Sequence, residues 1–173
     1  MSDDRSALDD LFSLAYEELR RLAHRVRTDG DGDTLNPTVL VHEAWIRMAG
    51  SPELGSLSRA HFKRVAARAM RQVLVDAARR RNAGKRGGGA PFVTFHDDLG
   101  GADGSVHDLL ALDLALDELS RMSPRQASLV EARFFGGLEM REVADALDIS
   151  EATAHRDWRA ARAWLSGQLG GPG

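Results

Sequence analysis

The residue types that catalysis requires are present in this chain, but they do not stand at catalytic spacings. His42 and Glu43 begin a zinc-protease pattern that lacks its second histidine, because position 46 is Ile46. The stretch GKRGGG around Lys85 contains the Gly-Lys pair of a phosphate-binding loop. No glycine stands upstream at the required spacing, however, and Arg86 replaces the Ser or Thr. We therefore expect neither of these enzymatic sites.

Metal-ligating residues also lack a recognisable pattern. The chain has no cysteine, which excludes disulfides and thiolate ligands and fits a reducing compartment. The histidines show no ligand spacing; the six are His24, His42, His61, His96, His107 and His155. We expect a protein that is not an enzyme, with no catalytic residue, metal, cofactor or small-molecule substrate.

The termini and apolar runs predict a cytoplasmic protein. The first residues, MSDDRSALDD, lack the basic flank and apolar core of a signal peptide. No apolar run approaches the roughly 20 residues that cross a bilayer. We expect no membrane span.

The charges are segregated, although the formal net charge is only −3. Residues 59–86 contain ten Lys and Arg against one acid, Asp76, whereas residues 96–118 contain seven acids and no Lys or Arg. Such asymmetry indicates a polyanionic partner for the basic segment.

Helical periodicity dominates the first half of the chain. Apolar residues recur at helical spacing over about residues 4–28, a second helix starts at Asn36-Pro37, and Ser58 can cap a third. The third helix is apolar on one face, from Phe62 to Ala77. It is basic on roughly the other, which carries Lys63, Arg64, Arg68, Arg71 and Arg79.

The second half also predicts helices, after a Gly- and Asp-rich stretch that has the composition of a linker. PFVTF, residues 91–95, is the one strand-like run and is too short to build a sheet. One helix ends near Met122, and the next is capped by Ser123-Pro124 and stops at Gly136-Gly137. The expected fold class is all-α.

The strongest motif is GLEMREVADALDISEATAHRDWRAARAWL. A short helix over 138–147, the turn DIS and a second helix capped by Ser150 match a helix-turn-helix. Ala154, Trp158, Ala161 and Leu165 form the buried stripe of the second helix. Its opposite side carries the candidate DNA-reading residues Thr153, His155, Arg156, Arg159 and Arg162. The alternative is a plain helical hairpin with a solvated charged face.

Two further residues of this helix have expected places. Glu151 and His155 are four apart and can pair on one side of it. Asp157 is expected toward the flank, where it would repel wrong phosphate registers or orient an arginine.

Together the two halves resemble a bacterial sigma factor of the extracytoplasmic-function (ECF) type, over about residues 8–169. The resemblance lies in LNPTVLVHEAWIRM, HFKRVAARAMRQVLVDAARRRNAGKRGGG and RDWRAARAWL, which are similar to one ECF-like subgroup. It implies a sigma region 2-like helical bundle over residues 1–86, a flexible Gly/Asp-rich linker over 87–106, and a sigma region 4-like helix-turn-helix domain over 107–173.

The resemblance also implies roles for particular residues. Polymerase docking would involve Val41, His42, Glu43, Trp45, Ile46 and Met48. Binding and melting of the −10 element would involve Arg64, Arg68, Arg71, Arg79, Arg80, Arg81, Lys85 and Arg86. The family's cap, reading and phosphate-contact positions for the −35 element correspond here to Ser150, Thr153, His155, Arg156 and Arg162. Arg159 joins them on the exposed face.

The implied function is to bind core RNA polymerase and direct promoter-specific transcription initiation. The implied partners are core RNA polymerase and promoter DNA, with an anti-sigma factor or other regulatory protein as a further candidate. One alternative is a free-standing helix-turn-helix regulator that binds operator DNA without polymerase. Another is a helical adaptor whose basic face binds an acidic partner.

Overall fold

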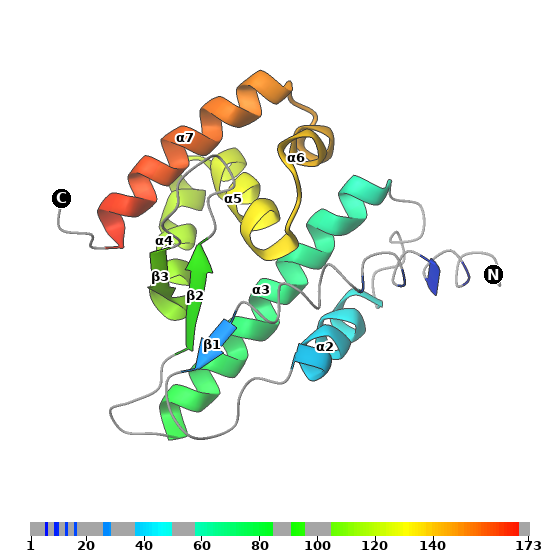
Figure 1. The fold of residues 1–173 in the computed structure, drawn as a ribbon, viewed down its shortest axis with the longest axis vertical. Coiled ribbons are helices and arrows are strands. Elements are labelled where there is room, and N and C mark those ends of the chain that lie inside the picture. The colour runs from blue at the N-terminus through cyan, green and yellow to red at the C-terminus, as the bar shows by residue number, and fades with distance from the viewer. Residues whose placement is uncertain are drawn as a thin grey trace.

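The longest helix, α3 (Arg59–Gly84), runs through the middle of the molecule, with α2 on one side and the C-terminal helices on the other (Figure 1). The computed structural model describes residues 6, 9–10, 13, 16, 26–28, 37–49, 58–84, 91–95 and 105–169. Their elements are β1 (Val26–Thr28), α2 (Pro37–Ala49), α3, β2 (Pro91–Phe95), β3 (Ser105–Asp108), α4 (Leu109–Met122), α5 (Pro124–Gly136), α6 (Met140–Leu147) and α7 (Glu151–Gln168). Helices dominate, so the predicted all-α class is confirmed.

The start of α3 and its buried face follow from its sequence. Alanine is frequent along it and favours the helical conformation. The hydroxyl of Ser58 accepts a hydrogen bond from the backbone N–H of His61 at 3.3 Å, as the predicted cap requires. Phe62, Met70 and Val73 are buried among the apolar positions that recur every three or four residues.

Helix α2 packs its apolar stripe against α3 and leaves two large apolar side chains in solvent. Val41, Ala44 and Met48 are buried, whereas Val39 and Ile46 are exposed. Arg47 of α2 forms an ion pair of 2.7 Å with Asp76 of α3 on the surface. Asn36, the predicted cap of this helix, lies outside the described residues.

The ends of α5 agree with the prediction. The hydroxyl of Ser123 accepts a hydrogen bond from the backbone N–H of Gln126, and Pro124 occupies the first turn. Gly137 closes the helix at φ 64°, a left-handed conformation that glycine adopts without a steric penalty.

A small antiparallel sheet corrects two predictions. β2 pairs with β1, where Val26 lies opposite Val93, and with β3, where Val93 lies opposite His107. PFVTF was expected to be too short to build a sheet, but it pairs with β3, which follows it closely, and with β1, which lies far away in the sequence. Residues 26–28, expected at the end of a helix, form a strand because they pair with β2. Most of that expected helix, 4–28, lies outside the described residues.

One apolar core extends through the helices of both halves. It runs from Leu40 on α2, through Met70 on α3 and Phe135 on α5, to Trp158 on α7. In this conformation, therefore, α3 packs directly against the C-terminal helices. No helix in the described part of the chain is long and apolar enough to cross a membrane.

Candidate nucleic-acid interface

Helices α6 and α7 are joined by a tight turn of three residues. Glu139 precedes α6, and its backbone N–H donates to the side chain of Glu142 at 3.2 Å, which belongs to a capping box. Asp148 ends α6 in a left-handed conformation at φ 55°. Ile149 follows and packs against the core. The helix α6 starts two residues later than expected.

Ser150 caps α7. Its Oγ accepts a hydrogen bond from the backbone N–H of Thr153 at 3.1 Å and donates one to the hydroxyl of Thr153 at 2.9 Å. The cap satisfies a backbone donor at the start of the helix, where no carbonyl is available within the helix. It therefore sets the point at which α7 begins.

The buried face of α7 is the one predicted, whereas on the opposite side Thr153 and His155 are half-buried. Ala154, Trp158, Ala161 and Leu165 are buried. The guanidinium of Arg133, on α5, lies 5.4 Å from the ring of Trp158 and holds it by a cation–π contact. The opposite side carries the exposed residues Arg156, Arg159 and Arg162.

Two of these arginines are available to an anionic ligand. Arg156 and Arg159 make no hydrogen bond or ion pair with any part of the chain that the structure describes. His155 is half-buried, and its Nε2 lies 3.7 Å from the carboxylate of Glu151, the pair that the spacing predicted. The centre of the solvent-exposed side of α7 is thus basic, and Arg156 and Arg159 there have no partner among the described residues.

Asp157 corrects the prediction that it lies toward the flank. It is buried, and its carboxylate accepts two hydrogen bonds from Arg125 of α5, at 2.6 Å from Nε and 3.2 Å from Nη2. The hydrogen bond and the charge of Asp157 raise the pKa of the Arg125 guanidinium above its ordinary value. The fork geometry joins α7 to α5, so Asp157 faces the protein and not the exposed arginines.

The predicted −10 residues differ in their surroundings. Arg64 and Arg68 line a groove of about 490 Å³ between α3 and the helices α4 and α5, and have no ion-pair partner among the described residues. Arg79 lies 3.5 Å from Asp113, and Arg80 lies 4.0 Å from Glu43. The side chain of Arg81 and all of Lys85 and Arg86 lie outside the description.

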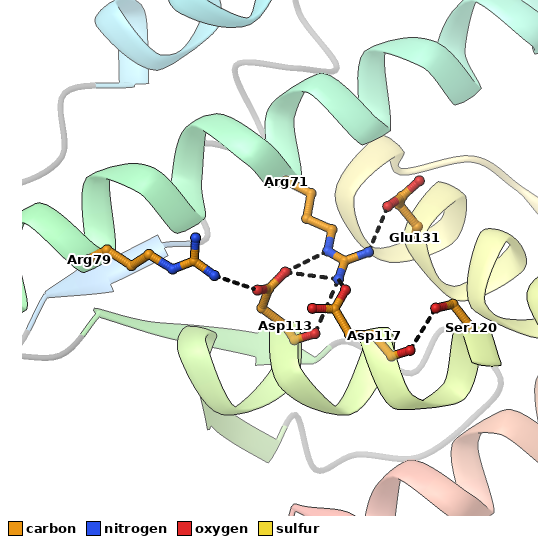
Figure 2. A network of polar contacts seen from close by, with 6 residues as sticks. All are labelled: Arg71, Arg79, Asp113, Asp117, Ser120 and Glu131. Atoms are coloured by element: carbon orange, nitrogen blue, oxygen red, sulfur yellow. Dashed lines mark hydrogen bonds and ion pairs between the residues drawn. The ribbon is translucent and has the colours of Figure 1, made fainter. Parts of the chain in front are cut away.

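Arg71 is held by three carboxylates of the C-terminal half (Figure 2). Its Nε donates to Asp113 at 2.8 Å, Nη1 donates to Glu131 at 2.9 Å, and Nη2 donates to Asp117 at 2.9 Å. Nη2 also donates to the backbone carbonyl of Asp113 at 3.1 Å. Burial lowers the pKa of the Arg71 guanidinium, but the hydrogen bond to Glu131 and the charges of Asp113 and Glu131 outweigh it and raise that pKa.

Lys63 corrects the prediction of a continuous exposed basic face. Only 7% of its side chain is exposed, and its Nζ lies 2.6 Å from the carboxylate of Glu142 on α6. A buried lysine needs such a partner because desolvation of an unpaired charge is costly. Lys63 therefore connects α3 to the first helix of the helix-turn-helix.

The predicted docking residues lie on both faces of α2. Val41 and Met48 belong to the buried stripe, because they stand seven residues apart on the side that packs against α3. In this conformation they are not surface residues, and this corrects their inclusion among the predicted docking residues. His42 is exposed, Glu43 and Trp45 are half-buried, and Ile46 is 70% exposed. These four form the accessible part of the set.

Sequence reasoning missed the roles of Asp157 and Asp113, although each left a signal. Asp157 stands three residues after Ala154 and four before Ala161, which are buried. Asp113 stands likewise between Leu109 and Leu116. An acid at a position of the apolar stripe indicates a buried ion pair. The partners, Arg125 and Arg71, are distant in sequence and carry no such signal.

The fold and the free arginines of α7 define a helical DNA-binding protein of the helix-turn-helix class. The family model described as ECF sigma factor matches residues 1–171. The chain therefore belongs to the ECF sigma factor family, a family of non-enzymatic transcription factors that act in transcription initiation. No curated protein matches the chain.

Proposed function

We propose that this sigma factor binds core RNA polymerase directly and selects promoters through two DNA contacts. The observation that carries the proposal is the face of α7, where Arg156 and Arg159 are exposed and have no partner in the described part of the chain, while Trp158 anchors the other side. Arginines held on a rigid helix suit the major groove, where a bidentate contact to guanine identifies the base.

The proposed division of labour follows the two halves. In the region 2-like half, residues 1–86, the exposed Ile46 with His42, Glu43 and Trp45 would dock on polymerase, and the basic face of α3 would hold the −10 element. In the region 4-like half, residues 107–173, α7 would read the −35 element. Residues 87–106 would join them, although β2 lies within this range.

Core RNA polymerase and promoter DNA are therefore the proposed partners. An anti-sigma factor or other regulatory protein is included among them on family membership alone. Docking would bury apolar surface that α2 leaves in water, which is a favourable contribution to association.

The test is reconstituted transcription with purified core polymerase and a library of promoter fragments. We expect the full chain to co-purify with core polymerase and to support initiation from a subset of fragments with a shared upstream element. An Ile46→Asp variant should lose core binding without loss of helical content. Failure of the wild-type chain to bind core polymerase would contradict the proposal.

A DNA-protection experiment distinguishes a sigma factor from the alternative, a free-standing regulator. A free-standing regulator would protect a palindromic operator by itself, because such proteins usually bind as symmetric dimers. For a sigma factor we expect specific protection only when polymerase is present.

A further inference from the structure

We propose that Arg125 of α5 contacts a phosphate of the DNA strand beside α7, and that the buried carboxylate of Asp157 holds its guanidinium in position for that contact. The sequence predicts DNA contacts on α3 and α7 but none on α5. The inference rests on the proposed function in one respect, because it takes α7 as the helix that enters the major groove.

The guanidinium of Arg125 faces the protein on one side and solvent on the other. Its Nε and Nη2 donate to the carboxylate of Asp157 at 2.6 Å and 3.2 Å. The Arg125 side chain is nevertheless 51% exposed, whereas that of Asp157 is 8% exposed. Of the five N–H donors of a guanidinium, the two on Nη1 and one on Nη2 have no partner in the described part of the chain. These donors are available to an anion on the solvent side.

The pair with Asp157 orients the guanidinium before any ligand binds. A buried carboxylate is costly unless it is paired, so Arg125 is kept in contact with Asp157. Two parallel N–H donors on one carboxylate fix the plane of the guanidinium as well as its position. An arginine that is already ordered loses little side-chain freedom when it binds a phosphate, and this favours binding.

The position of Arg125 within α5 also favours an anion. Ser123 caps the helix and Pro124 is its first residue, so Arg125 lies in the first turn, which contains no acid. The helix dipole is positive at this end, which disfavours a cation there and attracts a phosphate. Arg125 thus contributes nothing through the dipole to the stability of α5, but its charge and the dipole act together on an anion in solvent.

Asp157 places Arg125 at one flank of α7, against which α5 packs (Figure 1). Successive residues of a helix lie about 100° apart around its axis, so Asp157 lies between the exposed Arg156 and the buried Trp158. A helix with its side chains is about 10–12 Å across, close to the major-groove width of about 12 Å. The flanks of a helix in the groove therefore face the phosphates of the two strands. With Arg156 toward the bases, Arg125 faces one of those strands.

The contact would divide DNA binding between two neighbouring arginines. Phosphate contacts fix the position of a protein on the duplex and carry no direct sequence information, whereas base contacts select the sequence. Arg125 therefore supplies affinity that is equal for every promoter and sets the register of α7 in the groove. Arg156, which Asp157 does not bind, remains the candidate base contact.

The test measures binding of the full chain to a fluorescein-labelled DNA duplex of arbitrary sequence, by fluorescence anisotropy over a range of salt concentrations. Because Arg125→Ala alone also strands the charge of Asp157, the decisive variant combines Arg125→Ala with Asp157→Asn. This double variant has the net charge of the wild type and no stranded carboxylate. The matched control, Arg121→Ala with Glu118→Gln, also removes one arginine and one acid, both exposed and without partners in the described chain.

We expect the control variant to bind the duplex as the wild type does. The Arg125→Ala, Asp157→Asn variant should bind several-fold more weakly, and its slope of log affinity against log salt should be shallower by about 0.9, the contribution of one duplex phosphate. Wild-type affinity and slope in this variant would overturn the proposal, because Arg125 would then only stabilise the fold. If the variant loses its helical circular dichroism, Arg125→Gln with Asp157→Asn replaces it, since two amides can still form a hydrogen bond, and the same result is expected.

Transcription with core polymerase separates this inference from the proposed function. We expect the double variant to lose activity uniformly over all promoter fragments, because a phosphate contact does not distinguish sequences. Initiation by the wild type, with a loss in the variant confined to fragments that share one base pair, would overturn the phosphate contact alone. Absence of initiation by the wild type would overturn the sigma-factor proposal, while duplex binding by the free chain still tests Arg125.

Discussion

At the scale of single residues, a buried charge on α7 joins two helices, whereas its exposed neighbour is a candidate for contact with DNA. Asp157 and Arg156 are neighbours on α7, yet Asp157 is buried against Arg125, whereas Arg156 is exposed and unpaired within the described chain. Two adjacent positions, which point in different directions around the helix axis, thus carry a structural charge and a candidate reading charge. Their variants should consequently affect different properties.

Arg125→Ala should lower the Tm by several degrees, because it leaves the buried carboxylate of Asp157 without its partner. Adding Asp157→Asn should restore part of the loss by removing the stranded charge. Thermal unfolding followed by circular dichroism checks both. Arg121→Ala, which removes an exposed charge without a partner in the described chain, should leave the Tm unchanged. A double variant no more stable than Arg125→Ala would contradict the assigned role.

Arg156→Ala should relax discrimination at one position of the upstream element and leave stability unchanged. Loss of a good bidentate base contact costs about 1–3 kcal/mol of discrimination. Competition between promoter fragments that differ at single base pairs, transcribed by the reconstituted holoenzyme, measures it. Arg121→Ala serves again as the charge control. A uniform loss on all fragments would indicate a phosphate contact instead.

At the scale of elements, short local signals determine where the helices begin and end. Ser150 starts α7, Ser123 starts α5, and Gly137 ends α5 in a left-handed conformation. Each depends on residues within four positions in the sequence. The orientation of α7 therefore depends first on its own cap and on the three-residue turn before it.

Ser150→Ala should destabilise the protein by about 1 kcal/mol, because the backbone N–H of Thr153 loses its acceptor at the start of α7. For a chain of this length, such a loss corresponds to a fall in Tm of about 2–4 °C. Ser166→Ala, on the exposed side near the end of α7, is the matched control. An equal Tm for the two variants would show that the cap contributes nothing.

The short range of these signals explains which features could be predicted from the sequence. The caps, the turn and the buried Trp158 were predictable because helical periodicity and capping act over a few residues. The pairing of β1 with β2 was not predictable, because the two strands are more than 60 residues apart in the sequence. Arg71 was predicted as an exposed cation for the corresponding reason: the acids that hold it come from α4 and α5.

At the scale of the whole molecule, the interface between α3 and the C-terminal helices decides whether the two halves can act separately. It joins an apolar core with Phe62 and Leu138 to the ion pairs around Arg71 and Lys63. Apolar burial supplies most of the association free energy, and the buried charges demand their partners. The interface is therefore stable when fully formed and sensitive to small steric changes.

Gly136→Ala tests that sensitivity without altering any charge. The added Cβ would lie 2.8 Å from the Cβ of Ala67, which cannot move without shifting α3, and 2.6 Å from a methyl of Leu138. Overpacking costs about 1–3 kcal/mol, against a gain of about 1 kcal/mol from replacing a helical glycine, so we expect a net loss of up to about 2 kcal/mol.

Gly167→Ala is the matched control, because nothing lies within 4 Å of a Cβ added there and the residue belongs to α7. It should raise the free energy of unfolding by about 0.5–1 kcal/mol through the lower conformational entropy of the unfolded chain. Denaturant unfolding of both variants gives the comparison. Since the two substitutions are chemically identical, opposite signs can arise only from what surrounds each glycine. Equal stabilisation by both would mean that α5 and α3 do not meet at Gly136, and the interface would have to be placed elsewhere.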